Sequence, residues 1–237
     1  MRIYVIRHAD PDYENGTITA LGHQEAEALS ERLDDVRIDR IYSSPKGRAV
    51  HTAEYTAKRK GLEIEVLDWL AEVDWWSENE YNGHPLAVYN AHGFLVREME
   101  PQPTWGTWHE NEWFSDPRIR REFEVIQTGS DLLMADHGYV KDACGVYRHD
   151  EPNEVAIAVF CHNGLGLTWL AHLLNIPLPL FWTSFYLRPA SLTTVLMDER
   201  DGGKATPRCL NMSDETHLVA KGLDKARVPN GIVNNYE

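Results

Sequence analysis

Short runs of mostly apolar residues recur along the chain and are typical of buried β-strands. Three lie in the first 70 residues, at Ile3 to Ile6, Ile38 to Tyr42 and Leu62 to Leu67. Two more follow after residue 150, at Val155 to Cys161 and Leu192 to Met197. Apolar and β-branched runs of this length have the character of strands in a sheet covered on both faces. A last apolar stretch around residues 209–212 is expected to pair at an edge.

The segments between these strands carry apolar residues at helical spacing. Thr19, of a residue type that commonly precedes the first turn of a helix, is followed by an apolar stripe. Strands that alternate with helices favour an α/β fold: a doubly wound, mostly parallel sheet between two layers of helices. The turn from Asp10 to Gly16 contains proline, asparagine and glycine and is expected to be irregular, as are the last fifteen residues. The stripe consists of Leu21, Ala28, Leu29 and Leu33, and further helices are expected at 47–60, 117–134 and 164–174.

The alternation is interrupted between residues 69 and 149, where six of the eight tryptophans lie. We interpret 69–149 as an insertion that caps the sheet within a single domain spanning 1–237. Besides the helix, a weak hairpin pattern runs from His137 to Arg148. Aromatic clusters usually serve packing, so a satellite hydrophobic core is favoured over a lid that grips substrate. The six tryptophans are Trp69, Trp75, Trp76, Trp105, Trp108 and Trp113.

Charge and cysteine content narrow the choice of partners and compartment. The chain has 237 residues, with 23 basic against 37 acidic side chains and a net charge of −14, so its surface should repel nucleic acid and anionic membranes. No apolar run reaches membrane-spanning length, and the start lacks the features of a secretory signal. Cys144, Cys161 and Cys209 are too widely spaced for a Cys-x-x-Cys pair. We therefore expect a cytoplasmic protein without nucleic-acid or membrane partners.

Two of the predicted strands end in histidine, and this is the strongest indication of function. The first strand runs into Arg7 and His8, and the strand after residue 150 runs into His162. Open α/β sheets bind ligands at the carboxyl ends of their strands, so the two imidazoles can meet around one ligand. The second strand is followed by a Ser-Ser-Pro segment that adds Arg48. Because the overall charge is negative and arginines gather here, we predict a local phosphate site.

Phosphoryl transfer through a protein nucleophile is consistent with these residues. It needs an unprotonated attacking atom, positive groups around three oxygens, and an acid for the leaving alkoxide. Histidine can attack because its neutral form is well populated near pH 7. Arg7, Arg48 and His162 would supply charge or donors, and the helix after His162 would add backbone N–H groups. Such chemistry needs no metal ion or other cofactor, and the remaining histidines show no metal-ligand spacing.

The motifs at these strand ends resemble those of a known family. Arg7 to Ala9 matches an Arg-His-Gly motif with alanine in place of glycine, and Thr19 to Gly22 resembles a Leu-Thr-x-x-Gly segment. Ser43 to Ala53 is similar to a Ser-Ser-Pro-x-x-Arg-Ala-x-x-Thr-Ala block, and Phe160 to Gly164 to a His-Gly block with asparagine interposed. In this order the motifs resemble those of the histidine phosphatase superfamily, also called phosphoglycerate mutase-like.

The resemblance implies a role for each matching residue. His8 would be the nucleophile that becomes phosphohistidine. Arg7, Arg48 and His162 would form the phosphate pocket, and Asn163, beside the late histidine, is added to the phosphate-binding set. Ala9 and Asn163 stand where the family more often has glycine, which would alter the approach of the backbone to the phosphate.

The proton donor implied by the resemblance is a carboxylate that follows the third strand. This position corresponds to Leu70-Ala71-Glu72, and Glu72 is our choice. The glycine-spaced sequence that usually follows is replaced here, so Asp74, Glu78 and Glu80 remain alternatives.

The sequence therefore predicts a metal-independent phosphomonoesterase that acts through a phosphohistidine on a small phosphorylated substrate. A mutase of the phosphoglycerate type would use the same nucleophile. Mutases of the family that this chain resembles usually carry a Ser-x-Trp-Asn element. The 10–16 turn lacks this element, so a phosphatase is favoured over a mutase. A protein that binds a phosphorylated ligand without hydrolysing it is a further alternative, because the acid region and the glycine positions depart from the pattern.

Overall fold

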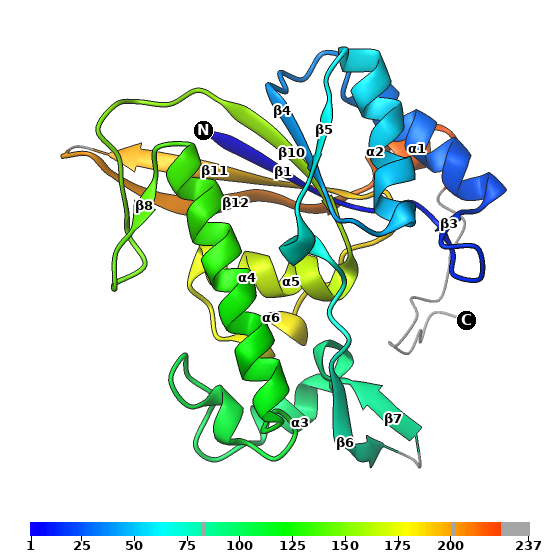
Figure 1. Ribbon diagram of the computed structural model, residues 1–237. Coiled ribbons are helices and arrows are strands. Elements are labelled where there is room, and N and C mark those ends of the chain that lie inside the picture. The colour runs from blue at the N-terminus through cyan, green and yellow to red at the C-terminus, as the bar shows by residue number, and fades with distance from the viewer. Residues whose placement is uncertain (82–83, 201, 224–237) are drawn as a thin grey trace.

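One eight-stranded sheet organises the part of the chain that the computed structural model describes, residues 1–81, 84–200 and 202–223. Its first four strands in spatial order are parallel, and the other four extend the sheet in antiparallel fashion (Figure 1). The strands in spatial order are β5 (Ile64–Val66), β4 (Arg40–Ser43), β10 (Ala156–Cys161), β1 (Arg2–Arg7), β11 (Leu192–Arg200), β12 (Lys204–Asp214), β9 (Tyr147–Arg148) and β8 (Val140–Lys141).

Side chains of the central strands alternate between two hydrophobic cores, because successive residues of a strand point to opposite faces. Ile3 and Val5 of β1 belong to one core, and Tyr4 and Ile6 belong to the other. Both faces are therefore covered, as a parallel sheet requires. The predicted α/β class with helices on both faces is confirmed.

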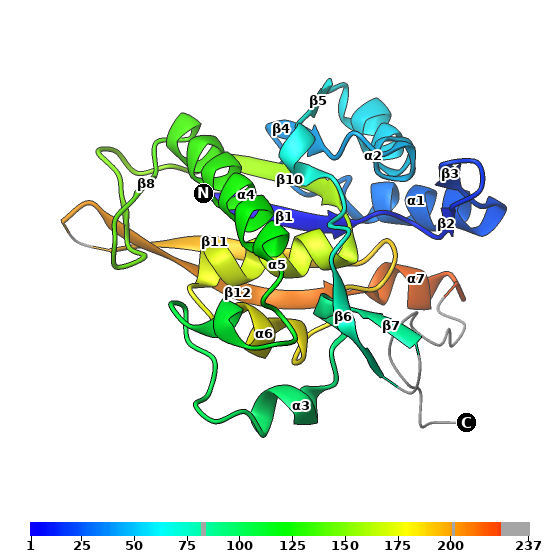
Figure 2. The same ribbon diagram turned by 60° about the horizontal axis from the view of Figure 1, so that its bottom comes forward.

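Three helices pack on the two faces of the central strands. Helices α1 (Ala20–Arg32) and α2 (Gly47–Lys60) pack beside each other on one face, and α5 (Asn163–Leu174) lies on the other (Figures 1 and 2). Thr19 caps α1, since its side chain accepts a hydrogen bond from the backbone N–H of Gly22 at 3.1 Å. Almost every residue of α5 is buried, which explains why its sequence is apolar on all sides.

Residues 69–149, expected to form an insertion, contain more regular structure than the sequence indicates. The predicted helix is α4 (Pro117–Asp136), capped by Asp116, and the predicted hairpin is formed by β8 and β9. Sequence reasoning missed the remaining elements of the region. They are the strands β6 (Trp76–Tyr81) and β7 (His84–Ala87), the helix α3 (Gly93–Arg97) and three short 3-10 helices, Asp68–Leu70, Val88–Asn90 and Trp108–Glu110.

Buried tryptophans join residues 69–149 to the main core. The rings of Trp75 and Trp108 contact Trp182 of α6 (Leu178–Trp182), with centroids 6.0 and 6.1 Å apart and planes inclined by 62° and 80°. All three belong to the same core as Ile3 and Val5 of β1 and the apolar residues of α5. Trp75 and Trp108 thus serve packing, and the core that they form is continuous with the main one rather than a satellite.

Several expectations about the rest of the chain need correction. The 10–16 turn was expected to be irregular, but Pro11–Asp12 (β2) and Thr17–Ile18 (β3) pair as a ribbon closed by Gly16 at φ 68°. The 209–212 stretch is part of β12 and pairs with β11, as expected; β9 pairs only with Lys204 and Ala205, so in the described chain this stretch has no second strand beside it. Helices α6 and α7 (Thr216–Ala220) were not expected. The last fifteen residues, which the sequence predicts to be irregular, lie outside the described part apart from Leu223.

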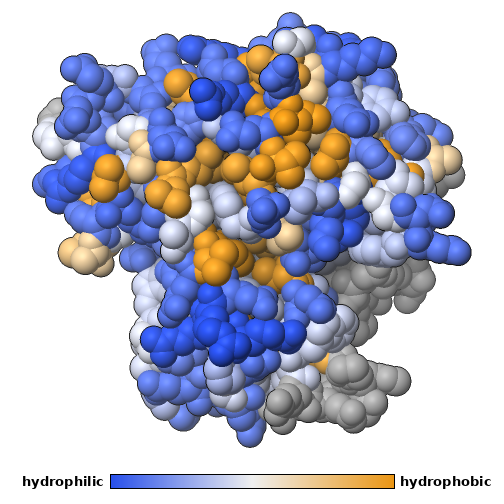
Figure 3. Space-filling view, in the orientation of Figure 1, coloured by the Kyte–Doolittle hydropathy of each residue, from blue (hydrophilic) through white to orange (hydrophobic). Residues whose placement is uncertain are grey.

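An apolar groove lies on the surface between β5 and α4. The exposed side chains of Val66, Val125 and Leu132 line it, with Trp69 below. Figure 3 shows apolar side chains gathered on this face of the molecule. None of the described helices is long and apolar enough to cross a membrane.

Helix α4 approaches the 3-10 helix at Asp68–Leu70 through a glycine, and this close contact yields a stability prediction. A Cβ at Gly129 would lie 2.4 Å from Cγ of Trp69, whose ring packs edge-on against Trp169 at 5.4 Å. Alanine gains about 1 kcal/mol of helix propensity, but overpacking costs about 1–3 kcal/mol, so Gly129→Ala should destabilise the fold by about 1 kcal/mol. Urea unfolding measures this change.

The neighbouring position provides the control. Thr128 is exposed on the same helix, so Thr128→Ala should leave the free energy of unfolding unchanged or slightly higher. A Gly129→Ala variant more stable than the parent by about 1 kcal/mol, the full gain in helix propensity, would show that the close contact of α4 with Trp69 is wrong.

Candidate active site

His8 directly follows the last residue of β1. Its imidazole is buried, and a hydrogen bond fixes its tautomer. The side chain is 1% exposed, and Nδ1 lies 2.7 Å from the carbonyl oxygen of Ala9. A carbonyl oxygen can only accept, so Nδ1 carries the proton and Nε2 keeps its lone pair. The backbone N–H of His8 donates to the carbonyl of Cys161 at 2.9 Å, which ties the two strand ends together.

The second histidine lies directly beside the first. His162 precedes the first turn of α5 and is fully buried, and its ring centroid is 5.1 Å from that of His8. Its Nε2 lies 2.7 Å from Oγ of Ser44, at the end of β4. Its Nδ1 is buried and has no hydrogen-bond partner among the described residues. Two imidazoles from distant parts of the sequence therefore share one site.

Two arginines supply positive charge around these rings. Arg7 is 6% exposed, and its Nη1 donates to the carbonyl of Leu187 at 2.6 Å and to the hydroxyl of Tyr186 at 3.1 Å. Arg48 lies in the first turn of α2, with its guanidinium carbon 5.3 Å from the ring centre of Tyr13. Within the described residues, Nε of both arginines is buried without a partner. Buried donors of this kind suit an oxyanion.

Burial and the arginines set the charge of the site. Burial lowers the pKa of His8 well below its usual value, and Arg7 and Arg48 lower it further. The pKa of His162 is lowered in the same direction, first by burial and then by His8 and the two arginines. Both imidazoles are thus neutral at physiological pH, while both guanidinium groups are charged. The net charge of the four side chains favours an anionic ligand.

Glu72 is held at the amino terminus of α5. Its carboxylate accepts hydrogen bonds from the backbone N–H groups of Leu165 at 2.8 Å, Val73 at 3.0 Å and Gly164 at 3.3 Å. Burial outweighs these bonds and the nearby Arg7, so the pKa of Glu72 is raised. A raised pKa keeps part of the population protonated, which a proton donor requires.

This arrangement corrects one expectation and explains one glycine. The first amides of α5 were expected to serve a phosphate, yet those of Gly164 and Leu165 bind Glu72. A Cβ at Gly164 would lie 2.9 Å from Oε1 of Glu72 and 2.8 Å from Cε1 of Tyr89, so only glycine allows the carboxylate to come this close.

The other candidates are placed differently. Asp74 is exposed and accepts a hydrogen bond from Nε1 of Trp76 at 2.6 Å. The side chains of Glu78 and Glu80 lie outside the described part of the chain. Oδ1 of Asn163 accepts from the backbone N–H of Leu187 at 3.0 Å, so phosphate binding would fall to its amide nitrogen. The described residues contain no cluster of three or more side chains that could hold a metal ion.

Sequence reasoning missed several supporting side chains. Ser44 and Thr52 both lie in the Ser-Ser-Pro block, and Thr52 accepts from the backbone N–H of Ala9 at 3.0 Å. Both are polar residues within a block that was predicted to lie at a strand end, and this could have indicated that they support the site. Tyr13 and Tyr186 lie outside every motif. They contact Arg48 and Arg7 because of how their loops fold, which the sequence does not indicate.

A family model decides the relationship of this chain to known proteins. The model of the histidine phosphatase superfamily, branch 1, matches residues 3–208. This chain belongs to the histidine phosphatase superfamily. The match spans all the strand ends described above, and the resemblance inferred from the motifs is confirmed.

Curated relatives of this family member are phosphatases by name. Phosphoserine phosphatase 1 of Hydrogenobacter thermophilus is 26% identical over 212 residues, covering 84% of this chain and 88% of the relative. The putative phosphoserine phosphatase 2 of the same organism is 28% identical over 155 residues, covering 58% and 73%. The family and these relatives support the predicted class, a phosphoric monoester hydrolase of the histidine phosphatase type.

Solved structures show the same fold. The phosphoserine phosphatase of Entamoeba histolytica, in complex with 3-phosphoglyceric acid, is 18% identical with a TM-score of 0.58, covering 92% of this chain and 98% of that one. A mycobacterial glucosyl-3-phosphoglycerate phosphatase is 19% identical with a TM-score of 0.56, covering 90% and 99%. At this identity the likeness concerns the fold alone.

The charges of the site predict how its histidines titrate. In the free protein the imidazoles of His8 and His162 should stay neutral well below pH 6.5, since the pKa of each is lowered. Inorganic phosphate would offset the two guanidinium charges and should raise both pKa values. Histidine-selective NMR titration measures both states, with signals assigned from His8→Gln and His162→Gln. Titration of either imidazole near pH 6.5 in the free protein would contradict this account of the site.

Proposed function

We propose that this chain hydrolyses small phosphate monoesters through a phosphohistidine formed on Nε2 of His8. The observation that carries the proposal is the surroundings of that nitrogen. Its lone pair is free because Nδ1 is bound to Ala9, and the second imidazole and two arginines with unpartnered Nε atoms lie around it. A tetrahedral anion with three peripheral oxygens fits such a set of donors.

The first half of the proposed reaction transfers the phosphoryl group to the enzyme. Nε2 of His8 attacks phosphorus, forming the N–P bond as the ester O–P bond breaks. Arg7, Arg48 and His162 stabilise the charge that develops on the three peripheral oxygens. Glu72 donates its proton to the leaving alkoxide, for which its raised pKa is suited.

The second half returns the enzyme to its starting state. Glu72, now ionised, removes a proton from water, and the resulting oxygen attacks phosphorus as the N–P bond breaks. Phosphate leaves, the electron pair returns to Nε2 of His8, and Glu72 is protonated again. Each group thus ends in the protonation state in which it began.

The proposed class of substrate is supported by the names of the curated relatives, and the proposed compartment is supported by the state of the cysteines. The names of the curated relatives support a small phosphorylated metabolite such as phosphoserine. The three cysteines form no disulfide, which supports a reducing cytoplasm. A mutase would transfer the same phosphoryl group to a second hydroxyl, and assays of 2- and 3-phosphoglycerate interconversion separate the two outcomes.

Removal of the nucleophile tests the proposed function. His8→Ala should lower turnover of phosphoserine and para-nitrophenyl phosphate by at least about 1,000-fold and abolish covalent labelling by a ³²P-labelled ester. The exposed His23, replaced in His23→Ala, is the matched control and should keep both properties. Retention of labelling in the His8→Ala variant would refute the phosphohistidine.

Leaving-group dependence tests the proton donor. Glu72→Gln should lower kcat for an alkyl ester such as phosphoserine by about 100- to 10,000-fold, because an alkoxide needs a proton to depart. The loss should be much smaller for para-nitrophenyl phosphate, whose phenolate leaves unassisted. Asp74→Asn should change neither rate, and the opposite ranking of the two variants would assign the proton to Asp74.

A further inference from the structure

A cavity of about 370 Å³ lies between residues 89–93 and the loop at residues 182–186. The first segment runs from the 3-10 helix at Val88–Asn90 into α3, and the second begins at the end of α6. Helices α3 and α6 lie beside each other (Figure 2). The cavity is therefore formed where part of residues 69–149 meets the loop that precedes β11.

Two tyrosines connect this cavity to the groups that we propose to react. Tyr186 lines it and accepts a hydrogen bond from Nη1 of Arg7 at 3.1 Å. Tyr89 lines it too, and a Cβ at Gly164 would lie 2.8 Å from Cε1 of Tyr89 and 2.9 Å from Oε1 of Glu72. Burial raises the pKa of the Tyr89 phenol, and the nearby Glu72 raises it further. The cavity thus adjoins both the phosphate-binding arginine and the proposed acid.

The positions of these groups determine where the alcohol part of a bound ester would lie. Its phosphoryl group would contact Arg7, and its bridging oxygen would have to lie near Glu72 to receive a proton. The atoms beyond that oxygen would point away from His8, because the attacking and leaving atoms lie roughly in line on opposite sides of phosphorus. The cavity between Tyr89 and Tyr186 begins at this point, so it can receive those atoms.

The lining of the cavity suits an uncharged ring. Phe185 lines it with 40% of its surface exposed, and its ring is held against Phe181 with centroids 4.6 Å apart. Such a ring offers a flat apolar contact, and the amide of Asn90 and the hydroxyl of Ser184 can bond to neutral polar groups. The described lining contains no Asp, Glu, Lys or Arg, and an ordinary imidazole such as that of His92 is mostly neutral above about pH 7. A charged group placed here would lose hydration without gaining an opposite charge.

We propose that this cavity binds the alcohol part of the substrate and selects an uncharged alcohol that carries a ring. The proposal rests on the hydrolysis proposed above and narrows its class of substrate. Sugars and aryl alcohols share the required chemistry, because both present a ring face and no charge. Phosphoserine would leave much of the cavity empty and would place two charges beside it, so it should be hydrolysed less efficiently than an ester with a neutral ring.

Steady-state hydrolysis of alkyl esters tests the proposal. Benzyl phosphate, glucose 6-phosphate and ethyl phosphate have leaving alcohols of similar basicity, so differences in kcat/KM report contacts of the alcohol part. The better of the two ring esters should have a kcat/KM at least about tenfold above that of ethyl phosphate, and above that of phosphoserine, because its ring is removed from water. Benzyl phosphate as the better ester would assign the cavity to an aryl alcohol, and glucose 6-phosphate would assign it to a sugar. Equal values for ethyl phosphate and both ring esters would overturn the proposal.

A variant of the lining tests whether the preference arises in this cavity. Phe185→Ala removes an exposed ring of the wall and should lower kcat/KM for the better ring ester by about tenfold, with ethyl phosphate unchanged. Leu132→Ala removes an exposed apolar side chain of α4 outside the cavity and should change neither value. Hydrolysis of ethyl phosphate reports the folding of both variants. A Phe185→Ala variant that keeps the full preference would overturn the proposal.

Binding of analogues that resist hydrolysis separates this proposal from the proposed function. 2-Phenylethylphosphonate and propylphosphonate replace the bridging oxygen of benzyl and ethyl phosphate with a methylene group, so their affinities do not depend on turnover. Calorimetric titration of the parent protein should show at least about tenfold tighter binding of 2-phenylethylphosphonate. Equal affinity would overturn the role of the cavity even if every ester is hydrolysed. Tighter binding without hydrolysis of any ester would support the cavity and refute the proposed hydrolysis alone.

Discussion

The in-register pairing of β1 with β10 is the constraint on which the site depends. Arg7 lies opposite Cys161 in this parallel pair, so the next residue of each strand, His8 or His162, leaves the sheet at the same level. Hydrogen bonds between main-chain groups thus bring together two imidazoles that are more than 150 residues apart in the sequence. Alternate side chains of these strands pack in two different cores, so a shift of register by one residue would move each side chain into the wrong core and is disfavoured.

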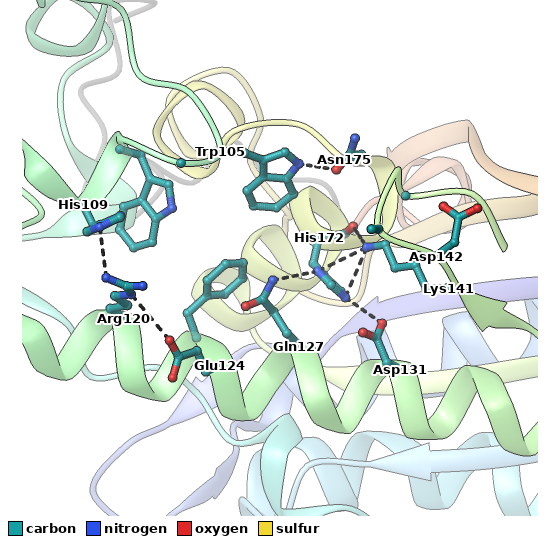
Figure 4. A pocket seen from close by; sticks show the side chains of 15 residues that line it. Trp105, His109, Arg120, Glu124, Gln127, Asp131, Lys141, Asp142, His172 and Asn175 are labelled. Atoms are coloured by element: carbon teal, nitrogen blue, oxygen red, sulfur yellow. Dashed lines mark hydrogen bonds and ion pairs between the residues drawn. The ribbon is translucent and has the colours of Figure 1, made fainter.

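A single helix connects the electrostatic parts of the molecule. The amino terminus of α5 binds Glu72 through backbone N–H groups, while Arg7 and Arg48 leave buried donors beside two neutral imidazoles. Uncompensated buried charge is unfavourable, so this end of the sheet is suited to an anion. The other end of α5 contributes His172, which lies within hydrogen-bond distance of Lys141 and Asp131 (Figure 4).

Periodicity and local motifs predicted the elements that are long enough to show a pattern. The strands β1 and β10 and the helices α2 and α4 were found in this way, and the motifs brought His8 and His162 to one site. The two-residue strands β2 and β3 are too short for periodicity, and β6 lies in a stretch dominated by polar residues. Contacts such as those of Tyr186 with Arg7, and the cavity between Tyr89 and Tyr186, depend on segments that meet only after folding.

The central claim is that His8, His162, Arg7 and Arg48 enclose one tetrahedral anion, with Nε2 of His8 as the attacking atom. A crystal structure with bound orthovanadate tests it most directly. The account predicts vanadium within bonding distance of Nε2 of His8, with its oxygens in hydrogen-bond contact with both arginines and His162. Vanadate bound away from His8, or bonded to another side chain, would contradict it.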